Sequence, residues 1–302
     1  MEKTYYSNGK LLITGEYTVL DGAQAFALPT IFGQYLHISK GSDKILKWQS
    51  YTVESNCWLN VDIDFNTIIY NDQLYSTEVN TLIGILHSAY KKNPAVLDNA
   101  EGYKIQTELT FPREWGLGSS STLINNIAQW FGIDAYALLW ESFGGSGYDI
   151  ACAQNDFPIL YTIENGKPTT KKVTFNPDFT DKIYFVYLNK KQNSRSAIEA
   201  YRNKQKEISA VIEAINQCTQ KALNAENVTE FTSALEKHEN IMASILEITP
   251  VKKQLFPDFK GTIKSLGAWG GDFVLAISET NPLPYFSEKG FKTILPYKEM
   301  IK

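Results

Sequence analysis

The chain has 302 residues, of which 43% are hydrophobic, 21% are charged and 13% are aromatic. This composition supplies enough apolar surface for a folded core, and it excludes disordered and fibrous proteins. The formal net charge is −4, from 29 Lys and Arg against 33 Asp and Glu, so no general electrostatic attraction to nucleic acid or to an anionic membrane is expected. Only three basic residues are Arg, namely Arg113, Arg195 and Arg202. Bidentate recognition of an anion is therefore available at few places.

The sequence indicates neither a membrane span nor a disulfide framework. No apolar stretch approaches the roughly 20 residues that cross a bilayer, and residues 1–10 contain no apolar segment of the secretory type. The three cysteines, Cys57, Cys152 and Cys218, are far apart and form no CxxC pair, so we expect buried thiols and no zinc site. We therefore expect a cytoplasmic protein.

The first third of the chain is predicted to consist of strands and turns, with no helix before about Thr81. A short helix is predicted at 81–91 because its apolar residues recur with helical spacing and Pro94 follows. The polar–apolar alternation at 103–111 predicts a half-buried strand, and a glycine-rich segment then leads into a helix that reaches Phe131. The earlier β-rich runs lie at 11–20, 35–38, 45–53 and 58–63.

The rest of the chain is predicted to combine strands with two long amphipathic helices. The strands are expected at 158–163, 171–175, 182–188 and 273–277, and the helices at 208–222 and 231–245. The polar stretch Asn165–Pro168 is the best boundary candidate, so the predicted domains are 1–167 and 168–302. Helices kept apart from antiparallel strands predict an α+β fold.

The segment Gly116–Ser121 reads Gly-Leu-Gly-Ser-Ser-Ser and lies between a predicted strand and a predicted helix. Its glycines allow the backbone to approach a ligand closely, and the helix start offers unpaired N–H groups to an anion. The hydroxyls of Ser119, Ser120 and Ser121 are also suited to phosphate or Mg²⁺. The alternative is a turn with serine caps.

Three further segments are candidate sites. Asp149, in the glycine-rich segment 144–151, is either a general base or a helix cap. Lys10, in an otherwise apolar strand, either pairs with a carboxylate such as Asp149 or reaches solvent from the strand end. The segment Lys264–Asp272 contains three glycines, which indicates a tight backbone approach either to a ligand or to another loop.

Taken together and in this order, these segments resemble the motifs of the GHMP kinases, a superfamily that includes galactokinase, homoserine kinase, mevalonate kinase and phosphomevalonate kinase. Residues 8–17, Gly116–Ser121 and Lys264–Asp272 look like its first, second and third motifs. The Gly145–Ala151 string is most similar to phosphomevalonate kinases. The resemblance implies an N-terminal domain like the second domain of ribosomal protein S5 and a ferredoxin-like C-terminal domain.

The resemblance also implies an ATP- and Mg²⁺-dependent kinase acting on mevalonate or 5-phosphomevalonate in isoprenoid biosynthesis. Asp149 would accept the proton of the acceptor hydroxyl, and Lys10 would keep Asp149 ionised. Other roles follow from the same motifs. The nucleotide would bind at Gly116, Leu117, Gly118, Ser119, Ser120, Ser121, Gly267, Gly270 and Gly271; the acceptor at Glu16, Ser146 and Arg195; and Mg²⁺ at Ser120 and Glu141.

Some features depart from the family pattern and leave alternatives open. Trp115 and Trp269 stand beside the two phosphate loops, where they either narrow a site or pack on each other. Arg195, just before a predicted helix, either grips a substrate phosphate, with Lys190 and Lys191 as alternatives, or is a solvated arginine. The alternative functions are a kinase for homoserine or a sugar, and a catalytically silent nucleotide-binding regulator. A second copy of the chain is the one protein partner that this interpretation keeps open.

Overall fold

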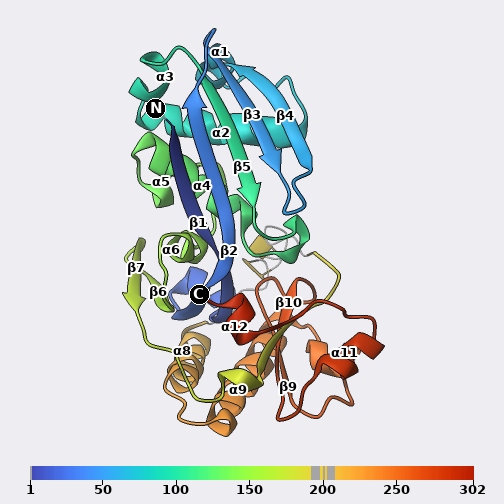
Figure 1. Cartoon of the computed structure of the whole chain (residues 1–302). Helices are drawn as coiled ribbons and strands as arrows, with labels where there is room; N and C mark the ends of the chain where they lie inside the picture. Colours follow the sequence, from blue (N-terminus) through green and yellow to red (C-terminus); the bar gives the residue numbers. More distant parts are fainter. Residues whose placement is uncertain (1, 192–197, 200, 203–207) are drawn as a thin grey trace. The chain divides into compact units, whose positions relative to one another are not determined.

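The computed structural model describes residues 2–191, 198–199, 201–202 and 208–302. The chain forms two compact units that are interleaved in sequence (Figure 1). Unit 1 comprises 1–9, 32–113 and 117–154, and unit 2 comprises 10–31, 114–116 and 155–302. The chain therefore passes between the units within its first two strands, β1 (Lys3–Thr14) and β2 (Ala25–Lys40), and around the short helix η2 (Arg113–Trp115).

Unit 1 is built on strands in the order β4-β3-β5-β2, with β1 also paired to β2. The strand β5 pairs antiparallel with β2 and parallel with β3. Alternate residues of these strands, such as Leu36, Trp48 and Ile105, pack in one core with the helices. The elements of this unit are β3 (Ile45–Tyr51), β4 (Cys57–Asp64), β5 (Tyr103–Leu109), α1 (Phe65–Tyr70), α2 (Thr77–Lys92), α3 (Ala95–Asp98), α4 (Ser119–Phe131), α5 (Ala135–Ser142) and α6 (Tyr148–Ala153).

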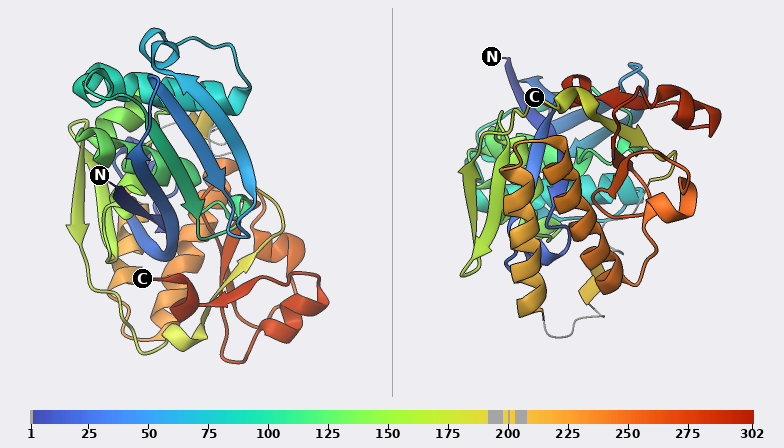
Figure 2. Two further views of the ribbon diagram at one scale, coloured as in Figure 1. Left: turned by 45° about the horizontal axis from the view of Figure 1, so that its top comes forward. Right: turned by 90° about the horizontal axis from the view of Figure 1, so that it is seen from below.

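Unit 2 contains a second antiparallel sheet, in the order β11-β8-β10-β9, and a pair of long helices, α8 and α9, that lie side by side (Figure 2). The hairpin of β6 and β7 pairs with the beginning of β2. The elements of this unit are η1 (Thr18–Asp21), β6 (Ile159–Glu164), β7 (Lys167–Lys172), η3 (Thr180–Lys182), β8 (Ile183–Tyr187), α8 (Ser209–Leu223), α9 (Val228–Leu246), α10 (Val251–Leu255), β9 (Thr262–Ser265), β10 (Phe273–Ile277), α11 (Leu283–Glu288), β11 (Ile294–Pro296) and α12 (Tyr297–Met300).

The α+β class predicted from the sequence is confirmed, whereas three details of the element prediction are wrong. The helix α1 precedes Thr81, where no helix was expected; it begins after Asp64, whose carboxylate accepts a hydrogen bond from the Asn66 N–H. The helix α2 begins at Thr77, four residues before the predicted start. Its first turn is mostly polar, so the spacing of apolar residues does not reveal it. The strand predicted at 171–175 lies at 167–172.

The polar stretch Asn165–Pro168 contains the two-residue turn of the β6–β7 hairpin, Asn165 and Gly166, and the first two residues of β7, and both strands of the hairpin belong to unit 2. Asn165 and Gly166 have φ values of 52° and 74°, which a tight turn requires. The division into 1–167 and 168–302 thus does not coincide with the compact units, and it stays a prediction.

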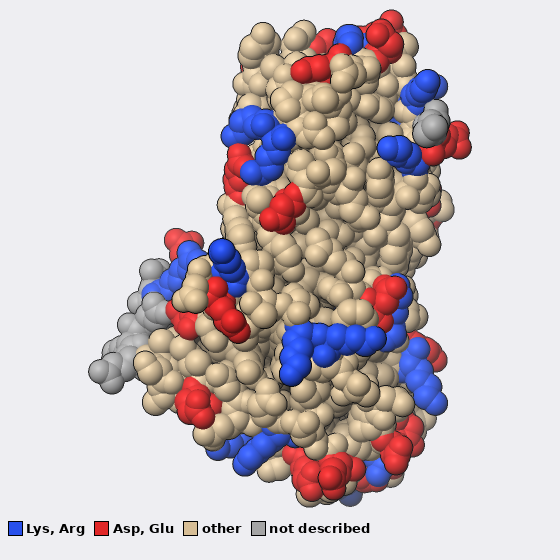
Figure 3. Space-filling view, turned by 90° about the vertical axis from the view of Figure 1, so that its left-hand side faces the viewer, with Lys and Arg blue, Asp and Glu red and all other residues tan. Residues whose placement is uncertain are grey.

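The surface charge follows the near balance of the composition. On the face drawn in Figure 3, basic and acidic side chains of the described residues are interspersed, and neither sign covers the face. None of the described helices is long and apolar enough to cross a membrane. Anion binding by the described surface therefore depends on local groups.

Candidate active site

The start of helix α4 forms the second motif. Gly118 occupies the N-cap position with φ of 93°, in the left-handed region that favours glycine, and no side chain caps the helix. The Ser121 hydroxyl donates to the Gly118 carbonyl at 2.8 Å, whereas Ser120 is exposed. The N-cap residue of α4 therefore offers no side-chain acceptor to the first N–H groups of the helix, and Ser120 is the exposed one of the three serines.

A buried polar network in unit 1 holds α4 in place, and the sequence analysis did not identify it. The Ser7 hydroxyl donates to Asn126 Oδ1 at 2.7 Å and accepts from Asn125 Nδ2 at 2.8 Å. Asn126 Nδ2 donates to the Gln34 carbonyl at 2.9 Å, and the Thr122 hydroxyl donates to Gln34 Oε1 at 2.7 Å. The network joins α4 to β1 and β2 and so fixes the start of the helix.

Asp149 lies in the first turn of α6, directly after Gly147, whose φ is 92°. Its Oδ1 accepts a hydrogen bond from the Ile150 N–H at 3.2 Å, and Ser146 before it is buried. The helices α4 and α6 pack against each other, and Gln154 Nε2 donates to Asn125 Oδ1 at 3.0 Å. Unit 1 thus brings together the two helices that carry Ser120 and Asp149.

Lys10 belongs to unit 2, where its Nζ donates to the Gly116 carbonyl at 3.0 Å. Gly116 has φ of 68°, and a Cβ there would lie 2.3 Å from the Asp272 Cγ. A larger residue at position 116 would have to displace the Asp272 side chain, and the positive φ also favours glycine. The first residue of the second motif thus lies against the last residue of the third motif. The predicted pairing of Lys10 with Asp149 stays a prediction.

Glu141, predicted as a Mg²⁺ ligand, lies on α5 and is paired with two lysines of α2. Its oxygens are 2.7 Å from Lys91 Nζ and 3.0 Å from Lys92 Nζ. Hydrogen bonds from these two lysines lower the pKa of the Glu141 carboxyl. No group of three or more His, Cys, Asp or Glu side chains suited to a metal occurs within the described ranges. The role of Glu141 in metal binding stays a prediction.

The third motif begins in strand β9 and turns through Gly267, Trp269, Gly270 and Asp272, all with positive φ. The loop closes where Asp272 N–H donates to the Lys190 carbonyl at 2.6 Å and the Asp272 carbonyl accepts from Leu188 N–H at 2.8 Å. Two non-glycine residues in the left-handed region indicate a backbone conformation that its surroundings impose.

The two tryptophans beside the loops pack on different partners. Trp269 is 2% exposed and lies in an apolar cluster with Tyr17, Met242 and Leu246. Trp115 meets Phe273 edge to face, with ring centroids 5.4 Å apart. Trp269 is therefore part of the core beneath the third motif.

Two of the predicted acceptor-binding residues need separate comment. Glu16 is 1% exposed, and its carboxylate oxygen lies 2.6 Å from Lys264 Nζ. Its role in binding the acceptor stays a prediction from the motif, and the proposed function does not use it. Arg195 lies outside the described residues. The other two arginines are described: Arg113 stacks on the Trp58 ring at 3.6 Å, and Arg202 is exposed.

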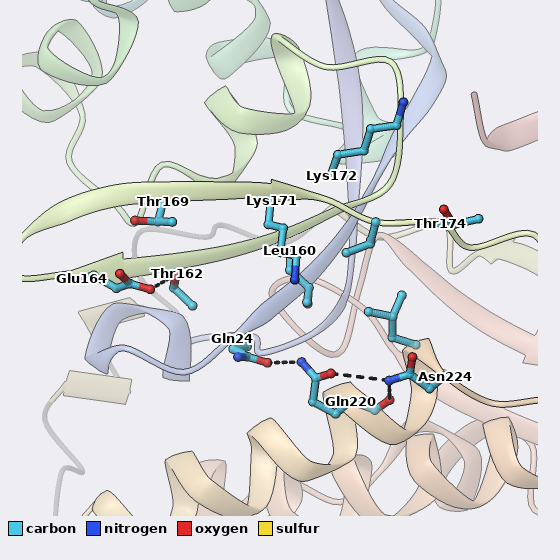
Figure 4. A pocket seen from close by; sticks show the side chains of 12 residues that line it. Gln24, Leu160, Thr162, Glu164, Thr169, Lys171, Lys172, Thr174, Gln220 and Asn224 are labelled. Carbon is cyan, nitrogen blue, oxygen red and sulfur yellow. Dashed lines mark hydrogen bonds between the residues drawn. The ribbon is translucent and has the colours of Figure 1, made fainter.

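A hollow of about 500 Å³ lies elsewhere in unit 2, between the β6–β7 hairpin and α8 (Figure 4). Gln220 Nε2 donates to Gln24 Oε1, and Asn224 Nδ2 donates to the Gln220 carbonyl at 2.8 Å. The Thr162 hydroxyl donates to Glu164 Oε1 at 3.1 Å. Because these polar groups satisfy one another, the hollow carries no assignment of a ligand.

Sequence comparisons do not identify this chain, because no protein-family model and no curated protein matches it. Structural comparison does find similar proteins. Mevalonate kinase from Methanococcus jannaschii is 17% identical, with 97% of this chain and 96% of that chain covered and a TM-score of 0.72. Phosphomevalonate kinase from Streptococcus pneumoniae, in complex with phosphomevalonate and AMPPNP, is 14% identical over 97% and 99%, with a TM-score of 0.72.

Galactokinase from Lactococcus lactis, complexed with galactose, is also similar, with 14% identity over 95% of this chain and 88% of that chain and a TM-score of 0.63. The enzymes found by structure are those that the three motifs resemble. The chain has the α+β fold of these kinases.

Proposed function

We propose that the protein is an ATP-dependent kinase that phosphorylates a hydroxyl group of a small-molecule acceptor, most simply mevalonate or 5-phosphomevalonate in isoprenoid biosynthesis. The observation that carries the proposal is the start of α4, where a glycine N-cap offers no side-chain acceptor to the first N–H groups beside the exposed Ser120. Such a helix start binds phosphate oxygens. The same motif order and the fold of the structural neighbours support this function.

The residues at this site fit ATP and Mg²⁺. The backbone N–H groups of 116–121 would bind the nucleotide phosphates, and the glycines of the third motif would allow a second backbone approach. The Ser120 hydroxyl is a hard oxygen ligand of the kind that Mg²⁺ prefers. Bound Mg²⁺ neutralises charge on the phosphate oxygens.

The chain's own side chains would act on the acceptor. Asp149 would accept the proton of the acceptor hydroxyl as that oxygen attacks the terminal phosphorus of ATP, and ADP would leave. Lys10 would hold Asp149 ionised in the assembled site. Since the transferred group needs little covalent help from the protein, most of the rate would come from positioning and charge neutralisation.

The test is a coupled ADP-release assay with Mg·ATP and a panel of mevalonate, 5-phosphomevalonate, homoserine and galactose. Turnover of one of the first two is the expected result, whereas turnover of homoserine or a sugar alone would reassign the acceptor. Binding of Mg·ATP without turnover of any acceptor would favour the regulatory alternative.

Asp149→Asn tests the mechanism in the same assay. It should lower kcat by at least about a hundredfold, because a positioned base is lost while the size of the side chain is kept. The affinity for Mg·ATP should stay within about twofold of the parent value, since Asp149 is assigned to the acceptor. Unchanged turnover would remove Asp149 from the mechanism.

We also place the reaction in the cytoplasm, where the three thiols would remain reduced. Cell fractionation tests this location. Cys152 and Cys218 are buried as expected, whereas Cys57 is exposed, so the expectation of a buried thiol is wrong at that position.

A further inference from the structure

Four charged or titratable residues of unit 2 meet in its interior, and we call them the buried charge cluster: Glu16, His238, Glu239 and Lys264. None is more than 4% exposed. Lys264 Nζ, on β9, lies 2.6 Å from Glu16 Oε1 and 3.5 Å from Glu239 Oε2. Glu16 follows β1, and the other two residues are neighbours on α9. Residues more than 200 positions apart thus share one buried site.

The hydrogen bonds of the cluster fix the state of His238. Its Nε2 accepts a hydrogen bond from the Gly15 N–H at 2.9 Å, so Nε2 carries no proton and a neutral ring is protonated at Nδ1. Glu16 Oε2 lies 3.4 Å from the same Nε2 and has no hydrogen-bond partner among the described residues. An ionised Glu16 would place two bare acceptor atoms against each other inside the protein, at a cost in free energy.

Counting charges leads to the same conclusion. One lysine faces two carboxylates, which leaves one negative charge unbalanced if both are ionised. A proton on Glu16 Oε2 neutralises the cluster and removes the repulsion between two bare acceptor atoms, because Oε2 then turns an O–H toward His238 Nε2, whose lone pair already accepts the Gly15 N–H. Two separate features, the charge imbalance and the contact between two acceptors, are thus explained by one proton.

Electrostatic shifts in this site point the same way. Burial raises the pKa of Glu16 to about 7, against the opposing effect of Lys264. Burial, helped by the charge of Lys264, lowers the pKa of His238 well below its usual range. The charged groups that act on Glu16 are Lys264, which lowers its pKa, and Glu239, which raises it. Nearby along the chain, the Thr14 hydroxyl pairs with the Thr219 hydroxyl of α8 at 2.8 Å, and Asp21 of η1 accepts a hydrogen bond from the Tyr201 hydroxyl at 2.7 Å.

The cluster holds the backbone at the beginning of the third motif. Ser265 donates both its N–H and its hydroxyl to the Glu239 carboxylate, at 3.1 Å and 2.7 Å for the shortest contacts. Lys264 Nζ donates to the Ser265 carbonyl. All the polar groups of Ser265, the last residue of β9, are therefore bound to the cluster just before the loop of residues 266–272 begins.

We propose that the buried charge cluster is a positioning device for the loop of residues 266–272, and that it takes up one proton on folding, shared between Glu16 and His238. The positioning part rests on the proposed function, in which this loop approaches the nucleotide. The proton part rests on the fold alone.

The two titrations have opposite effects on stability. Glu16 binds its proton more tightly in the folded protein, so its contribution to stability is complete below pH 4.5 and is lost as the pH rises toward 7. His238 binds its proton less tightly when folded, so its contribution is present above pH 6.5 and is lost in acid. In the parent protein the loss of the Glu16 contribution and the gain of the His238 contribution oppose each other between about pH 5 and 6.5. Replacing Glu16 leaves only the His238 effect on stability, and replacing His238 leaves only the Glu16 effect.

Two variants test the proton by urea unfolding between pH 5 and pH 8. Glu16→Gln replaces the acid by an amide of the same size that still accepts from Lys264 and carries no charge, so we expect it to fold. Its stability relative to the parent should rise with pH, by on the order of a hundredfold in the unfolding equilibrium constant. The stability of His238→Gln relative to the parent should instead fall as the pH rises toward 6.5. Equal differences at pH 5 and pH 8 for both variants would overturn the shared proton.

A third variant tests positioning. Glu239→Gln weakens the acceptor of Ser265 and should raise KM for Mg·ATP at least fivefold while kcat changes less than twofold. Glu213→Gln, on the exposed face of α8, is the matched control and should leave both constants unchanged. Equal KM values for the two variants would overturn the positioning role. If the parent protein binds no Mg·ATP, the proposed function and the positioning role both fail, whereas the unfolding comparison still decides the proton.

Discussion

The two glycine-rich loops are held in place by different chemistry. The start of α4 depends on uncharged groups, in which Ser7, Gln34, Asn125 and Asn126 exchange hydrogen bonds in the interior of unit 1. The loop of residues 266–272 in unit 2 depends on the buried charge cluster. The side chains of both supports are almost fully buried. The first support includes Thr122, the residue after the segment 116–121, and the second binds Ser265, the residue before the loop of residues 266–272.

The difference predicts how each loop responds to change. A neutral network loses one hydrogen bond at a time and does not titrate between pH 5 and 8. The buried charge cluster is balanced only as a whole, so removing its cation, Lys264, leaves an uncompensated negative charge in a low-dielectric interior. The uncharged network at the start of α4 should therefore tolerate substitution and be insensitive to pH. The buried charge cluster should tolerate substitution poorly and respond to pH.

Lys264→Met is expected to have the largest effect. It removes the only cation that faces Glu16 and Glu239 in the cluster and should lower the free energy of unfolding by about 3–5 kcal/mol at pH 7. Urea unfolding measures this loss. Lys289→Met, which breaks an exposed ion pair with Asp258, is the control and should cost about 0–1 kcal/mol. Equal losses for the two variants would mean that the cluster is not a unit of stability.

Asn126→Ala is expected to have an intermediate effect. It removes the acceptor of the Ser7 hydroxyl and the donor to the Gln34 carbonyl and should cost about 1–3 kcal/mol. The cost should be the same at pH 5 and pH 8, because no member of the network titrates in that range. Gln129→Ala, at an exposed position on the same helix, removes only contacts of 3.4 Å to Tyr6, Ser7 and Asn126 and should cost under about 1 kcal/mol. A pH-dependent cost for Asn126→Ala would remove the distinction between the two supports.

Glu141→Gln is expected to have the smallest effect and tests a charged pair at the surface of unit 1. Lys91 is about half exposed, so the loss of the ion pairs should cost only about 0–1 kcal/mol. The Mg²⁺ concentration that gives half-maximal turnover should not change, because Glu141 is already paired with two lysines. A higher Mg²⁺ requirement would instead support the role that the motif comparison gave to Glu141.

The elements that local patterns determine were predictable from the sequence. The strand at 273–277 and both long helices of unit 2 were found because apolar spacing over a short window decides them. The six-residue helix α1 was missed, because a single turn and a half offers too little periodicity against the strand-like run before it. The interleaving of the two units could not be read from any window, since the chain passes between them inside continuous strands.

The candidate site divides in the same way. The glycine segments and Asp149 were recognisable because motif order is a sequence property. The buried charge cluster was not recognised, although Lys264 was within the third motif, because its partners lie 248 and 25 residues away and periodicity carries no information about them. Lys264 itself, close to Ile263 and Leu266 at the start of the third motif, was the available signal, because burial of such a charge requires a partner.

The hairpin of β6 and β7 has a consequence for the behaviour of the protein at high concentration. The strand β7 ends the order of strands, so one row of its backbone N–H and C=O groups has no neighbouring strand in the part of the chain that the structure describes. Its six residues include Pro168 and the lysines 167, 171 and 172, all features that discourage a further strand from adding. Aggregation by edge-to-edge strand addition is thereby suppressed at this end of the sheet, and substitutions that neutralise these lysines would remove that protection.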